Sequence, residues 1–102
     1  MKFFCISDNI DTQLGMQLAG IECVVLHQPH HFERELALAF KRKDVGVILV
    51  TEKLIKLDRA LVFDYKLNNK RPLIVEIPDR HATSKVSDSI ARYVKEAVGI
   101  DI

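Results

Sequence analysis

The sequence predicts a small α/β fold, a doubly wound four-stranded parallel sheet with helices on both faces. Short apolar runs alternate along the 102 residues with segments of helical periodicity, and the run at 45–50 (VGVILV) is apolar without alternation. Such a run is typical of a strand that helices cover on both sides. Regular alternation of strand and helix favours right-handed crossovers between parallel strands. We expect one domain spanning residues 1–102.

The chain begins with a predicted strand and a short helix. The run 3–6 (FFCI) lacks helical spacing and is followed by polar, turn-forming residues, which indicates a buried strand. Thr12 is the expected N-cap of the helix, and Leu14 and Leu18 stand four residues apart on it. Gly20 tolerates the left-handed conformation that ends many helices.

A second strand and a second helix follow. The run 21–26 predicts a strand that ends before Pro29, because proline cannot donate a ladder hydrogen bond. Residues 30–43 predict an amphipathic helix with basic residues at its C-terminal end, where the helix dipole favours them. We expect the strand at 45–50 to lie inside the sheet.

The second half repeats the pattern. Thr51-Glu52 is expected to cap a single third helix that runs to Asn68-Asn69. Its predicted apolar stripe consists of Leu54, Leu57, Leu61 and Tyr65. Residues 73–77 predict the fourth strand. A fourth helix is then expected, with Gly99 as its C-cap and residues 100–102 as a tail. Its stripe consists of Val86, Ile90, Val94 and Ala97.

The charge balance excludes several classes of partner. Fifteen basic and fourteen acidic residues leave a net charge of +1, so no overall field draws the protein to nucleic acid or to acidic lipid. The apolar start of the chain turns polar after six residues, and no apolar run approaches the roughly 20 residues of a spanning helix. We therefore expect no nucleic-acid partner, no direct membrane insertion and a cytoplasmic location.

Ligands of doubly wound sheets bind beyond the carboxyl ends of the strands. The segments to inspect are 7–12, 27–31, 51–52 and 78–84. A phosphate-binding loop needs clustered glycines, yet the chain has only four and lacks both G-x-G-x-x-G and G-x-x-x-x-G-K. The sequence therefore disfavours nucleotide binding, and we expect no cofactor and no catalytic residues.

A receiver-like or phosphotransferase-like signalling domain is the alternative interpretation of this fold. Asp8 could stand for one of a receiver's acidic residues, but Thr51 occupies the position of the phospho-accepting aspartate. Cys5 could stand for a phosphocysteine, but it lies within a strand and does not head an anion-binding loop. Cap and turn roles for Asp8 and Thr51, and burial of Cys5, are the favoured interpretations.

The sequence gives little support for a metal site or for a reactive cysteine. His27, His30 and His31 flank Pro29, but no cluster of Cys or carboxylates completes a tetrahedral set, so a solvated loop is favoured and no metal is expected. Cys23, like Cys5, lies in an apolar run and is expected to act as a small hydrophobic residue.

Several segments together resemble the F subunit of the V-type and archaeal-type ATPases (ATP synthases). Asp44 to Glu52 (DVGVILVTE) is similar to the family's D-x-G-I-I-x-I-T-E block, and Pro72 to Pro78 resembles its P-x-I-(V/L)-x-I-P strand. Val94 to Ile102 matches its V-E-K-A-V-G-x-D-I ending, and the segment from Ser7-Asp8 to Ile21 resembles its opening motif. Ser7 replaces the usual glycine, and loop 79–84 lacks the glycine-rich pattern seen in many members.

The resemblance implies a non-catalytic role. A member of this family binds the coiled coil of the D subunit in the central stalk, turns with it inside the A/B catalytic hexamer, and helps couple ATP hydrolysis or synthesis to proton or sodium transport. It needs no cofactor and is peripheral to the membrane.

Apolar residues near the C-terminus suggest where such a partner binds. The stripe of the fourth predicted helix is complete without four further residues, which we expect to contact the partner. They are Tyr93, Val98, Ile100 and Ile102. The alternative is that Ile100 and Ile102 fold back onto the protein's own sheet.

Overall fold

The computed structural model describes residues 1–78, whose strands form one four-stranded sheet. The strands are β1 (Lys2–Ser7), β2 (Glu22–Val25), β3 (Val45–Thr51) and β4 (Leu73–Ile77), in the spatial order β2-β1-β3-β4. All three neighbouring pairs are parallel. β3 lies inside the sheet with all seven residues buried, which confirms the interpretation of its unbroken apolar run.

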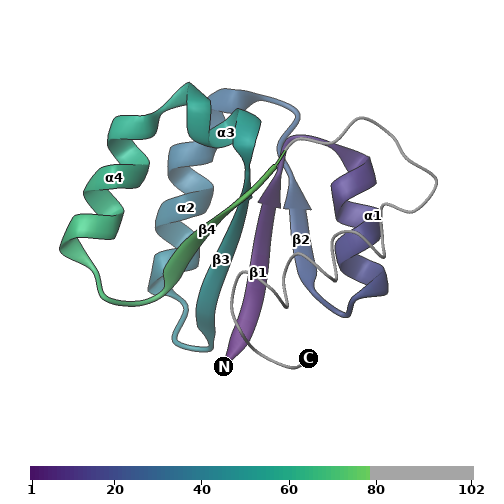
Figure 1. The fold of residues 1–102 in the computed structure, drawn as a ribbon, viewed down its shortest axis with the longest axis horizontal. Coiled ribbons are helices and arrows are strands. Elements are labelled where there is room, and N and C mark those ends of the chain that lie inside the picture. Colours follow the sequence, from purple (N-terminus) through teal and green to yellow (C-terminus); the bar gives the residue numbers. More distant parts are fainter. Residues whose placement is uncertain (79–102) are drawn as a thin grey trace.

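Helices cover both faces of this sheet, as predicted. They are α1 (Ile10–Leu18), the 3-10 turn η1 (Pro29–His31), α2 (Phe32–Lys41), α3 (Glu52–Leu57) and α4 (Arg59–Asn68). Figure 1 shows α2, α3 and α4 gathered on one side of the strands and α1 on the other. The doubly wound α/β architecture is therefore confirmed.

Alternation along the strands divides the core into two layers. On β1, Phe4 and Ile6 pack with the cores of α2, α3 and α4, whereas Cys5 packs with Met16 of α1. Because side chains alternate between the two faces of a strand, Leu49 of β3 also lies in the core layer between the sheet and α1. The predicted amphipathic character of α2 is confirmed, with three residues buried and Phe40 half-buried on one side.

The first helix begins earlier than predicted. Its N-cap is Asn9, which has an extended backbone and whose side-chain oxygen accepts the N–H of Thr12 at 2.7 Å. Thr12 is therefore an internal, buried residue and not the cap. The predicted end is confirmed, because Gly20 has φ of 77° and the N–H of Ile21 bonds back to the Met16 carbonyl at 2.8 Å.

The predicted third helix is two helices. α3 ends at Leu57, and Asp58 leaves the helical conformation with φ of −151° and ψ of 73°. The Asp58 carboxylate accepts the N–H of Leu61 at 3.1 Å and so caps α4. The predicted stop at Asn68 is confirmed. The predicted fourth helix and the C-terminal tail lie outside the described residues.

Candidate functional site

The polar residues at the carboxyl ends of β1 and β3 bond to one another. The backbone N–H of Asp8 donates to the hydroxyl of Thr51 at 3.2 Å. The Ser7 hydroxyl donates to the Asn9 carbonyl at 2.8 Å and accepts the Asn9 N–H at 3.0 Å. Ser7 and Thr51 are 0% and 1% exposed, so these bonds satisfy two buried hydroxyls. The hydrogen bonds of this turn link the ends of β1 and β3 at the position where doubly wound folds usually bind ligands.

This geometry bears on the receiver-like alternative. The structure brings Asp8 and Thr51 together, as that alternative requires, but the Thr51 hydroxyl is buried and engaged with the Asp8 backbone. The Asp8 carboxylate accepts a hydrogen bond from the Asn9 side chain at 3.1 Å. Thr51 therefore acts as a buried hydrogen-bond acceptor between the ends of β1 and β3, and it supplies no carboxylate for Mg²⁺ or phosphate.

His27 lies in a different hollow from His30. The rings of His30 and His31 meet edge to face with centroids 4.3 Å apart, and His27 lines a shallow hollow of about 280 Å³ beside Asp8 and Asp11. Within residues 1–78, no three His, Cys, Asp or Glu side chains converge so that they could hold one metal ion.

The two cysteines are neighbours across the β1–β2 pair. Cys5 is paired in register with Cys23, and its side chain is fully buried. A hydrogen bond with Cys23, followed by burial, raises the pKa of the Cys5 thiol far above its usual range. Cys5 is therefore held as a neutral thiol, the opposite of the activated thiolate that a phosphocysteine role requires.

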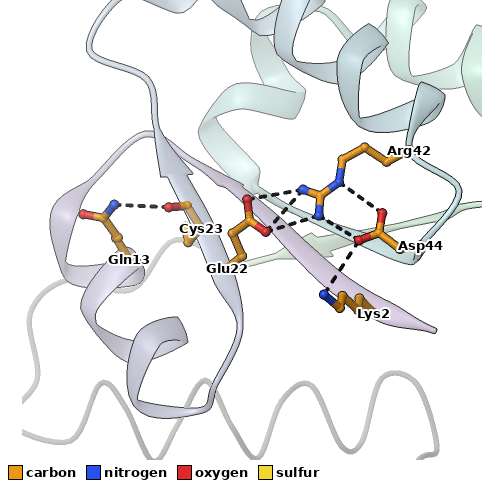
Figure 2. Close-up of polar contacts among 6 residues, drawn as sticks. All are labelled: Lys2, Gln13, Glu22, Cys23, Arg42 and Asp44. Carbon is orange, nitrogen blue, oxygen red and sulfur yellow. Dashed lines mark hydrogen bonds and ion pairs between the residues drawn. The ribbon is translucent and has the colours of Figure 1, made fainter.

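An ion cluster joins the starts of β2 and β3 (Figure 2). The guanidinium of Arg42 contacts Glu22 at 3.2 Å and Asp44 at 3.0 Å, and Lys2 adds a longer contact to Asp44 at 3.9 Å. Arg42 also lies over the ring of Phe4, 5.1 Å from its centroid. The hydrogen bond from Arg42 lowers the pKa of the Asp44 carboxyl. The cluster ties segments distant in sequence, and local sequence patterns carried no signal for it.

The outer side of α1 is an exposed apolar surface, which we name the α1 ridge. It consists of Ile10, Leu14 and Leu18. The sheet-facing side of α1 is instead formed by the buried Thr12, Gly15 and Met16. The side chain of Gln13 holds the helix to the edge strand by donating to the Cys23 carbonyl at 3.1 Å (Figure 2). The spacing of Leu14 and Leu18 thus predicted the helix correctly, but these two residues lie on its exposed side.

A second exposed apolar surface, the α4 ridge, lies on the other side of the sheet. It consists of Ala60, Phe63 and Leu67. Phe63 is 61% and Leu67 69% exposed, while Val62 faces the core at 4%. Leu57, predicted on the core stripe, is also exposed, because the break at Asp58 turns the end of α3 out of register with α4.

The predicted docking residues Tyr93, Val98, Ile100 and Ile102 lie outside the described residues. None of the helices in residues 1–78 combines the length and the apolar character needed to cross a bilayer. The exposed apolar surfaces named within this range are the two ridges.

Comparison with known proteins gives matches over the whole chain. Residues 4–94 match the family described as ATP synthase (F/14-kDa) subunit. The chain is similar to the F subunit of the A-type ATP synthase of Thermococcus sibiricus, with 30% identity covering 100% of this chain and 98% of that protein. The protein of the same name from Thermococcus kodakarensis gives 30% identity with the same coverage. That from Methanocaldococcus jannaschii gives 25% identity, covering 100% and 99%.

Proposed function

This chain belongs to the family of the ATP synthase (F/14-kDa) subunit, and we propose that it is a non-catalytic rotor component in the central stalk of an A-type or V-type ATPase. In this role it binds the coiled coil of the D subunit inside the A/B hexamer. It helps couple ATP hydrolysis or synthesis to proton or sodium transport. It is cytoplasmic and peripheral to the membrane, where it is held by its partners.

The observation that carries the proposal is the end-to-end match with proteins that bear the F-subunit name. The alignment with the Thermococcus sibiricus protein covers 100% of this chain and 98% of that protein, so the similarity is not confined to a shared strand or helix. The site geometry supports a binding role, because the hydroxyls of Ser7 and Thr51 and the thiol of Cys5 are occupied inside the fold.

The contact with the D subunit includes, in this proposal, the apolar residues near the C-terminus. They are Tyr93, Val98, Ile100 and Ile102. Truncation after Val98 removes Ile100 and Ile102 and tests the part played by this tail. We expect the melting temperature to change little, while affinity for the partner falls by about 1–3 kcal/mol, the range for losing a few interface residues. A truncated protein that melts much lower but binds with unchanged affinity contradicts this part of the proposal.

Co-expression with the D subunit encoded in the same genome tests the binding role itself. We expect one copy of each chain to elute together from gel filtration at micromolar concentration, with an interface on the order of 1,200–2,000 Å². Elution of the two proteins as separate peaks contradicts the proposal.

A further inference from the structure

Helix α4 carries apolar side chains on two opposite sides. Val62 packs into the core beside the half-buried Leu61 and Tyr65. At about 100° per residue, the α4 ridge is centred roughly 170° away from this buried side. A second apolar surface on the side away from the core is typical of a surface that another protein covers. The core covers one side of α4, and the ridge is left exposed.

The spacing of the α4 ridge is that of a coiled-coil seam. Ala60, Phe63 and Leu67 follow each other at intervals of three and four residues, as the a and d positions of a heptad do. In this register Ala60 and Leu67 are at a and Phe63 is at d. The g positions on one side of the seam are Arg59 and Lys66, and the e position on the other side is Asp64. Residues at e and g positions commonly pair with opposite charges on the facing helix.

The charges beside the ridge are available for such pairing. Arg59 and Lys66 stand two turns apart and border a groove of about 410 Å³ between α4 and β4. The groove is also lined by apolar side chains such as Val62 and Phe63 and by the acidic Glu76 of β4. Neither cation forms an ion pair with another residue in the described part of the chain. An apolar seam bordered by two unpaired cations complements an apolar stripe bordered by carboxylates.

We infer that the α4 ridge is the surface that receives one helix of the coiled-coil partner, with Asp or Glu of that helix facing Arg59 and Lys66. The inference rests on the proposed function, since it names the part of this chain that contacts the D subunit. It adds a described surface to the C-terminal residues proposed above.

The α1 ridge is a matched comparison on the same molecule. Its three residues are spaced four apart, which does not reproduce the alternating intervals of a heptad seam. Asp11, not a cation, lies beside it in the first turn. Figure 1 shows α1 and α4 at opposite ends of the longest axis, so substitutions on one ridge leave the other unchanged.

The experiment compares two double variants of the full chain for binding to the purified D subunit by calorimetry. Phe63→Gln with Leu67→Gln changes the α4 ridge, and Leu14→Gln with Leu18→Gln changes the α1 ridge. Because all four side chains are more than half exposed, both variants should fold, which circular dichroism checks. We expect the α4 variant to weaken binding at least about 10-fold and the α1 variant less than about 3-fold.

A charge test keeps the inference falsifiable if the apolar variant fails to fold. We expect the wild-type affinity to fall between about 50 mM and about 500 mM NaCl, concentrations chosen to span weak and strong screening. Arg59→Glu with Lys66→Glu should weaken binding and reverse this salt dependence, because the new carboxylates repel those of the partner. If the wild type binds the D subunit and either α4 variant binds it equally well, the inference is wrong, whereas the proposed function still stands. Absence of wild-type binding overturns both.

Discussion

Replacing Asp58 by alanine tests the cap that separates α3 from α4. The Asp58 carboxylate accepts the N–H of Leu61 at 3.1 Å, and its backbone N–H bonds to the Ile55 carbonyl at 3.2 Å. Asp58→Ala removes the side-chain bond and leaves the N-terminus of α4 without its acceptor. The change also removes a negative charge that interacts favourably with the helix dipole.

The magnitude follows from the exposure of the site. Because Asp58 is exposed, its replacement leaves no cavity, and the loss is limited to that of a helix cap, about 1 kcal/mol within a range of about 0.5–2. For a protein of this size, a change of about 1 kcal/mol lowers the melting temperature by about 4–8 °C. Val62 is the one buried side chain of α4, so local opening of this helix is expected to become easier as well.

Calorimetry and amide hydrogen exchange measure the two effects. Exchange of the α4 amides should accelerate about five-fold, the factor that corresponds to about 1 kcal/mol. Asp58→Asn is the control, because asparagine caps helices about as well as aspartate. A melting temperature of the alanine variant within about 1 °C of wild type would show that Asp58 does not stabilise α4 as a cap. An asparagine variant that melts as low as the alanine variant would show the same.

Three further predictions concern the core, the ion cluster and the buried thiol. Leu36→Ala, at a side chain 0% exposed, should lower the free energy of unfolding in urea by about 2–5 kcal/mol, whereas Leu38→Ala, at 51% exposed, should change it by less than about 0.5. Arg42 lowers the pKa of the Asp44 carboxyl in the folded protein. The ion pair therefore stabilises the fold at pH values above the ordinary pKa of aspartate, and this stabilisation is lost as the pH falls through the lowered pKa of Asp44. Arg42→Met should therefore raise the Asp44 pKa in an NMR titration; an unchanged value counts against the cluster. Cys5 should resist thiol labelling in the native protein and react on denaturation, as peptide-resolved mass spectrometry can show; rapid native labelling contradicts its burial.

The sheet could be predicted from sequence because its signals are local. β3 is a run of β-branched and aliphatic residues that only Gly46 interrupts. β1 and β4 are short apolar runs bounded by turn residues or prolines. The alternation of these runs with helical segments then leaves few topologies for the chain. Gly20 marked the end of α1 because a positive φ favours glycine.

The remaining features depend on choices between near-equivalent residues or on distant contacts. Asn9 and Thr12 are both good caps, and the Ser7 turn places Asn9 first at the end of β1. Asp58 sits within an apolar periodicity that continues across it, so the pattern alone indicated one helix. In the Arg42 cluster, Arg42 and Glu22 are 20 positions apart, and only the β2–β1–β3 arrangement brings them together.

Periodicity also could not tell the two sides of α1 and α4 apart. Leu14 and Phe63 are as apolar as the buried Met16 and Val62, and the sequence does not state which side the sheet occupies. An apolar residue left outside is informative only once the core has been located, which is why the α4 ridge was found in the structure alone.

Native mass spectrometry of the intact ATPase, purified through an affinity tag on this chain, tests the rotor assignment most directly. A central-stalk component lies on the rotation axis, so the account predicts one copy of this chain per A/B catalytic hexamer, retained with the D subunit when the hexamer is stripped away. Recovery of the chain without its A, B and D partners, or in one copy for every catalytic subunit, would contradict it.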